Sequence, residues 1–164
     1  MNTVDIWNTV DMDYVRQVAA KRHAAALSVG AVNKRFSDHT DLDRDVVGVK
    51  GEVLAHEYEG WGALPEVPGS GDGGVDHWDG EIGFDIKTRD RKNGDLLLPK
   101  EREIKYHFVI MAETPGVQDP RVRLVGWVDI ETCQKHWKLH LEGAPPFHFT
   151  TDTYLVPRYL LRPL

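Results

Sequence analysis

Three acidic side chains and a lysine near the middle of the chain have residue types and spacing that suit a cation site. Glu52 comes first, Asp76 follows, and the triplet Asp85-Ile86-Lys87 comes last. Carboxylate oxygens are preferred ligands of hard divalent cations, and a lysine beside them supplies a positive charge or a proton-transfer group. These side chains can act together only if the helices and strands that carry them bring them close to one another.

A β-hairpin is predicted around Asp79-Gly80. This dipeptide is favoured in a two-residue type I′ turn, because both central residues need positive φ. With these two residues as the loop, Asp76 lies opposite Gly83. Side chains alternate along a strand, so Asp76 shares a face with Asp85 and Lys87, and Gly83 leaves room between the two carboxylates. A register slip of one residue would move Asp76 to the other face.

A helix is predicted from about residue 42 to residue 58, with Glu52 in its second half. Gly48 and Gly51 each lower its intrinsic stability by about 1 kcal/mol relative to alanine, so their presence calls for a structural reason. Gly48 and Ala55 lie on the same side of the helix as Glu52. We therefore expect the helix to approach another element closely at this side and to bring the Glu52 carboxylate there.

The other segments predict an α/β domain with a mixed central β-sheet flanked by helices. A helix capped by Asp11 or Asp13 begins the chain, and a glycine- and proline-rich loop occupies residues 60–74. One domain is expected, because about 160 residues bury enough surface to fold without staples. The expected parts are a helical region at 1–40 with a short helical piece after Gly30, a core at 42–129 with strands at 106–113 and 121–128, and a helix at 130–141 with a tail to 164.

Composition favours a soluble cytoplasmic protein without a membrane partner. The chain has one cysteine, which excludes an internal disulfide and fits a reducing compartment. No apolar run approaches the roughly 20 residues of a membrane span. The formal net charge of −6 argues mildly against a protein that coats nucleic acid non-specifically, but basic residues gather in two stretches, at 14–37 and 87–105. These stretches are either a phosphate-binding surface or solvated basic faces.

The series Glu52, Asp76 and Asp85-Ile86-Lys87 resembles the active-site pattern of the PD-(D/E)XK nuclease superfamily, which has the restriction-endonuclease-like fold. The resemblance covers residues 46–129, about half the chain. It consists of a helix with a glutamate, a hairpin with an aspartate and an Asp-x-Lys triplet, and two further strands. Val75 stands where the family pattern has proline, which lowers the specificity of the motif. Members cut duplexes, junctions, flaps and ends, so the substrate is not inherited with the fold.

The resemblance implies a Mg²⁺-dependent endonuclease in which Mn²⁺ substitutes for Mg²⁺. Asp76, Asp85 and the backbone carbonyl of Ile86 would hold the ion, while Glu52 would complete that shell or position a second ion. Lys87 would orient or deprotonate the attacking water and stabilise the transition state. Such chemistry is consistent with phosphodiester hydrolysis, which needs an activated nucleophile and neutralised phosphate charge. The alternative from another class is a non-catalytic nucleic-acid-binding or assembly protein that keeps the fold.

The expected partner is nucleic acid, DNA rather than RNA, and members of this size often act as homodimers. Basic side chains from both stretches would bind the phosphate backbone: Arg22, Lys34, Arg35, Arg89, Arg91, Lys92 and Lys100.

Two other interpretations of individual motifs stay open. Asp85 and Lys87 on one strand face would also form an ordinary surface ion pair, worth less than about 1 kcal/mol. Cys133, His136 and His140 have a spacing that would gather them on one side of a helix as zinc ligands, although an amphipathic helix explains the same spacing.

Overall fold

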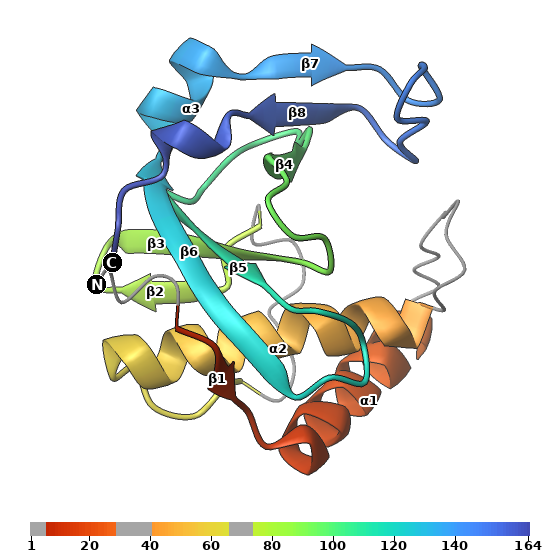
Figure 1. Ribbon diagram of the computed structural model, residues 1–164, viewed down its shortest axis with the longest axis vertical. Coiled ribbons are helices and arrows are strands. Elements are labelled where there is room, and N and C mark those ends of the chain that lie inside the picture. The colour runs from red at the N-terminus through yellow and green to blue at the C-terminus, as the bar shows by residue number, and fades with distance from the viewer. Residues whose placement is uncertain (1–5, 29–40, 66–73) are drawn as a thin grey trace.

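The computed structural model describes residues 6–28, 41–65 and 74–164 (Figure 1). The short helical piece after Gly30, most of the loop at 60–74, and Lys34 and Arg35 lie outside the described residues. The elements are β1 (Asn8–Thr9), α1 (Met12–Ser28), α2 (Asp41–Glu59), β2 (His77–Asp79), β3 (Ile82–Arg89), β4 (Leu96–Pro99), β5 (Phe108–Glu113), β6 (Arg121–Asp129), α3 (Ile130–His136), β7 (Lys138–His140), β8 (Thr153–Val156) and the 3₁₀ turn η2 (Arg158–Leu160).

A five-stranded sheet in the order β1-β6-β5-β3-β2 forms the centre of the fold. Strands β3 and β5 are parallel and the other neighbours are antiparallel, so the sheet is mixed. Helices α1 and α2 cover one face, and a second sheet of β4-β8-β7 lies with α3 on the other side (Figure 1). The predicted α/β class with a mixed sheet is confirmed, but on the second side a small sheet takes most of the place expected for helices.

Alternation along β3 and β5 divides the buried side chains into two clusters. Ile86 and its register partner Ile110 belong to the cluster under α1 and α2. Val109 and Met111, which pair with Asp85 and Lys87, belong to the cluster under the second sheet. The two faces of β3 therefore look toward different layers, as period-two alternation requires.

Helix α1 begins where the sequence predicts. The Asp11 carboxylate accepts hydrogen bonds from the backbone N–H groups of Asp13 and Tyr14, at 3.0 and 3.2 Å, and so satisfies two donors that the first helical turn leaves free.

Helix α2 lies close to the sheet at Gly51. A Cβ atom added there would lie 1.9 Å from Thr88 Oγ1 and 3.0 Å from Ala112 Cβ. The Thr88 hydroxyl also donates to the backbone carbonyl of Gly48, at 3.4 Å. The predicted close approach is present, but its position differs: it occurs at Gly51, whereas an added Cβ at Gly48 meets no described atom within 4 Å.

The hairpin of β2 and β3 forms in a register that differs from the prediction. Trp78, not Asp76, pairs with Gly83, so the two-residue loop is Gly80-Glu81. Gly80 has a φ of 60° at the first loop position, the arrangement of a type II′ turn. The indole of Trp78 lies over Gly83 and occupies the space that was expected to separate the carboxylates. Because the shift is two residues, Asp76 keeps its place on the Asp85 side.

The predicted helix over 130–141 is wrong in its second half. Helix α3 ends at His136, and His140 belongs to strand β7, which pairs with β8. Trp137 follows the helix in an extended conformation, and its ring stacks on Tyr154, with centroids 3.7 Å apart. Cys133, His136 and His140 therefore do not share a helix side, and the zinc interpretation loses its basis.

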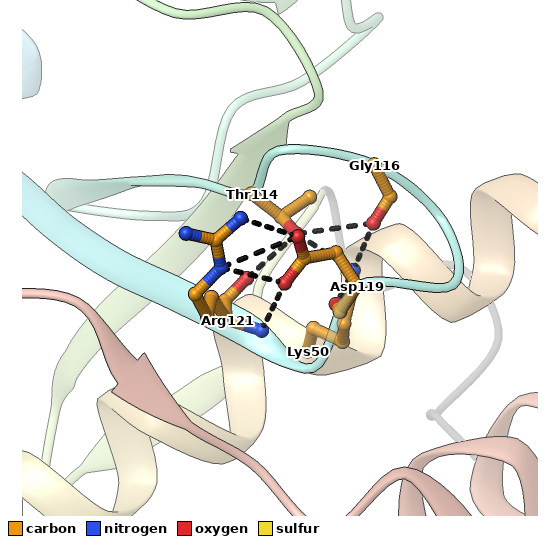
Figure 2. A network of polar contacts seen from close by, with 5 residues as sticks. All are labelled: Lys50, Thr114, Gly116, Asp119 and Arg121. Atoms are coloured by element: carbon orange, nitrogen blue, oxygen red, sulfur yellow. Dashed lines mark hydrogen bonds and ion pairs between the residues drawn. The ribbon is translucent and has the colours of Figure 1, made fainter.

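Lys50 on α2 is completely buried and fixes the connection between β5 and β6 (Figure 2). Its ammonium donates to the Thr114 hydroxyl at 2.7 Å and to the carbonyls of Gly116 and Asp119, the latter at 2.9 Å. Burial lowers the pKa of Lys50 to about 8, against the attraction of Asp119. The network holds α2 and the end of the sheet in one arrangement.

Across the described residues, no helix has the length and apolar character needed to cross a membrane.

We expect alanine to have opposite effects at the two glycines of α2. Gly51→Ala should lower the free energy of unfolding by about 1 to 3 kcal/mol, because the new methyl group overlaps Thr88. Gly48→Ala should raise it by about 0.5 to 1 kcal/mol through helix propensity alone. Urea unfolding followed by circular dichroism measures both. Equal effects at the two positions would contradict the packing described for α2.

Lys50→Met should destabilise the protein by about 1 to 3 kcal/mol, because three oxygens at the β5–β6 connection lose their donor. The exposed Lys135 on α3 provides the control, and Lys135→Met should change stability by less than about 0.5 kcal/mol. Urea midpoints of the two variants give the comparison. A Lys50→Met variant as stable as the control would show that the network contributes nothing.

Candidate active site

Asp85 and Lys87 form an ion pair on the face of β3 that looks away from α2. Lys87 Nζ lies 2.7 Å from Asp85 Oδ1, and the Asp85 side chain is 1% exposed while that of Lys87 is 30% exposed. Asp85 Oδ2 is buried and has no hydrogen-bond partner among the described residues. This is not an ordinary surface ion pair, because one carboxylate oxygen is buried and has no hydrogen bond from the described residues to replace those it would make with water.

Asp76 lies at the edge of β3, next to Asp85. Asp76 directly precedes β2, which begins at His77. Its Oδ2 accepts a hydrogen bond from the backbone N–H of Ile86 at 2.7 Å, so the carboxylate points toward β3. The charge of Asp76 contributes to the raised pKa of Asp85, as expected for two neighbouring carboxyls. The predicted meeting of these two aspartates with Lys87 is therefore present. The Ile86 side chain packs in the core under α2.

Glu52 approaches from the α2 side and has a partner that the sequence did not indicate. Arg22 Nη1 lies 2.8 Å from Glu52 Oε1 and 2.7 Å from Oε2. Glu52 also interacts electrostatically with Asp76 and Lys87, which places it at the same edge of β3. Arg22, which the sequence predicted to bind phosphate, is thus held inside the site.

The pKa values of Glu52, Asp85 and Lys87 are shifted by burial and by the charges of their neighbours. Burial, followed by the charge of Asp76, raises the pKa of Glu52 to about 7 against the opposing effect of Arg22. Burial also raises the pKa of Asp85, and Asp76 adds to this shift while Lys87 opposes it. Burial lowers the pKa of Lys87, but Asp85 and Asp76 outweigh burial and raise it above its usual value. Lys87 is therefore a fixed cation in this arrangement.

The donor set suits a divalent cation, although the side chains are not arranged as a finished coordination shell. No group of three or more His, Cys, Asp or Glu side chains has metal-binding geometry within 6–28, 41–65 and 74–164. The reason is visible in the contacts: Glu52 is paired with Arg22, Asp85 with Lys87, and Asp76 with a backbone N–H. The unpartnered Oδ2 of Asp85 beside a second carboxyl is the observation that favours cation binding here.

Besides Arg22, four residues of the predicted phosphate-binding set are described, and these four differ in exposure. Arg91, Lys92 and Lys100 are exposed near the end of β3 and after β4. Arg89 is half-buried and donates to the carbonyl of Asp95, so it stabilises the turn that follows β3. The exposed three remain available to a polyanion.

His56 is a further polar group at the site, one helical turn after Glu52. Its Nδ1 donates to the Gly62 carbonyl at 3.1 Å, and its Nε2 is buried without a partner among the residues described. Its ring meets those of Trp61 and His77, which stack on each other with centroids 3.9 Å apart. The i+4 spacing from Glu52 was a usable signal for His56. No local signal connected Arg22 with Glu52, because thirty residues separate them.

No protein-family model, curated protein or solved structure matches this chain. The resemblance to the PD-(D/E)XK superfamily therefore stays a prediction from the motif residues.

Without divalent cations, the stability of the protein should fall as pH rises through the raised pKa of Glu52. The folded state holds a proton on Glu52 up to about pH 7, whereas the unfolded state releases it near its ordinary pKa of 4.5. Stabilisation from this proton is complete below pH 4.5 and is lost as pH rises through 7. The glutamine of Glu52→Gln does not titrate. From pH 5 to pH 8, the free energy of unfolding of this variant should therefore rise by about 2 kcal/mol relative to that of wild type.

Urea unfolding in the presence of EDTA measures this difference. Glu113 provides a matched control, because it is also buried but its pKa is lowered by hydrogen bonds from Arg158 and Arg123 that outweigh the effect of burial. The difference between Glu113→Gln and wild type should stay constant from pH 5 to pH 8. A constant difference for Glu52→Gln as well would mean that Glu52 is ionised throughout.

Proposed function

We propose that this protein is a divalent-metal-dependent nuclease that hydrolyses phosphodiester bonds in DNA, with Mg²⁺ as its cation and Mn²⁺ as a substitute. The observation that carries the proposal is the buried Asp85, which has Lys87 on one oxygen, no partner in the described chain on the other, and Asp76 beside it. A structural ion pair would not need the second carboxyl, whose presence makes the pair less stable.

Asp76 and Asp85 would hold the cation, with the backbone carbonyl of Ile86 as the third ligand that the resemblance implies. When bound, the cation supplies positive charge that neutralises the phosphate and makes water a stronger acid. The ion pair with Asp85 orients Lys87, whose raised pKa keeps it charged, and its partly exposed ammonium is suited to stabilising a phosphate oxygen as charge develops there. In this protonated state Lys87 positions water and does not remove a proton from it.

The restriction-endonuclease-like core is part of the same proposal. Helix α2 carries a buried glutamate against the sheet, the β2–β3 hairpin carries the aspartate and the Asp-x-Lys triplet, and β5 and β6 complete the centre of the sheet. This order along the chain supports the core expected for the superfamily. Exposed basic side chains near the end of β3 and after β4 support binding of a nucleic-acid backbone: Arg91, Lys92 and Lys100.

Cleavage of linear, nicked and branched DNA with Mg²⁺ or Mn²⁺ tests the proposal. Asp85→Asn and Lys87→Ala should each lower the cleavage rate by about 100-fold or more, because one removes a cation ligand and the other a transition-state charge. Asp13→Asn and Lys135→Ala change the same residue types at exposed positions of α1 and α3 and should retain wild-type rates. EDTA should abolish cleavage.

Equal cleavage by wild type and both site variants would show that the activity comes from elsewhere. Binding of these DNA molecules without cleavage under any condition would instead favour a non-catalytic nucleic-acid-binding or assembly protein.

A further inference from the structure

We infer that the guanidinium of Arg22 takes the place of a second cation at Glu52, so that this site binds one divalent cation, between Asp76 and Asp85. The inference rests on the proposed function, since it concerns the cation of the same site. It replaces both metal-binding roles that the sequence left open for Glu52 with a pairing to Arg22, and it makes Arg22 a positioning residue.

The contact between Arg22 and Glu52 has the geometry of a chelated ion. A single nitrogen, Nη1, lies 2.8 Å from one carboxylate oxygen and 2.7 Å from the other. A cation bound to both oxygens of a carboxylate occupies the same position, only somewhat closer. A metal ion could take this position on Glu52 only by displacing the guanidinium.

Arg22 is also held where it is. Its side chain is 12% exposed and that of Glu52 is 9% exposed, so water screens the pair weakly. Arg22 Nη2 donates to the carbonyl of Pro65 at 3.3 Å, which fixes the second arm of the guanidinium. Unlike a lysine, a guanidinium stays charged in proteins, so Glu52 always faces a full positive charge.

Glu52 is carried by α2, whereas Asp85 lies on the face of β3 that looks away from α2. Ile86 packs with the core under α2, so Asp85 and Lys87 point to the opposite face of β3. Asp76, at the edge of the strand, interacts with both Glu52 and Asp85. Asp76 and Asp85 can therefore share a cation, while Glu52 is paired with Arg22 and acts on Asp76 through charge.

Mn²⁺ binding to the full chain tests the inference without depending on catalysis. Isothermal titration calorimetry, together with the electron paramagnetic resonance signal of free Mn²⁺, gives the number of bound ions and their affinities. Wild type should bind one Mn²⁺, and Asp85→Asn should weaken that binding at least tenfold. Arg22→Gln should raise the stoichiometry to two by freeing Glu52, and Arg22→Gln with Glu52→Gln should return it to one.

Arg16 provides a matched control on α1, because it is exposed and donates to Gln118 outside the site. Arg16→Gln should bind one Mn²⁺ with wild-type affinity. Two ions in wild type, or one ion in a folded Arg22→Gln variant, would overturn the inference.

Should Arg22→Gln fail to fold by circular dichroism, Glu52→Gln alone decides. It should bind one Mn²⁺ within about threefold of the wild-type affinity, whereas loss of binding would make Glu52 a ligand of the single ion and refute the inference. Failure of the proposed function has a different signature, since wild type itself would then bind no Mn²⁺ or would bind it without cleaving nucleic acid.

Discussion

The contact of α2 with the sheet at Gly51 is the constraint on which the candidate site depends. Successive residues of a helix point about 100° apart, so Lys50, Gly51 and Glu52 face three directions. Lys50 reaches the connection after β5, Gly51 lies against Thr88, and Glu52 reaches the edge of β3. A helix that moved outward to admit a larger residue at the central position would pull both charged neighbours from their partners.

Charge at the site is balanced locally and incompletely. Glu52 is paired with Arg22 and Asp85 with Lys87, while Asp76 accepts a hydrogen bond from the backbone N–H of Ile86. Burial strengthens these attractions and equally strengthens the repulsion among the carboxylates. Burial raises the pKa values of Glu52 and Asp85, and the charge of Asp76 adds to both shifts. A protein that kept these groups only for stability would do better with apolar side chains, so the arrangement supports the proposed cation site.

Local pattern in the sequence predicted the parts of the fold that local forces determine. The helix with Glu52, the hairpin and the two buried strands all follow from periodicity and turn chemistry. Strand β7 was mistaken for helix because its partner β8 lies more than ten residues downstream, where Tyr154 also stacks on Trp137. The Arg22–Glu52 pair was missed for the same reason, since two helices must pack before it exists.

The hairpin shows how a site can survive changes in the loop beside it. Its turn lies at Gly80-Glu81 instead of Asp79-Gly80, and Asp76 still meets Asp85 because the register moved by two residues. Within the paired strands, insertions and deletions of even length keep both carboxylates on one face, whereas odd ones turn one of them to the opposite face. Among chains that share this site, the spacing of the two aspartates is expected to drift by pairs of residues.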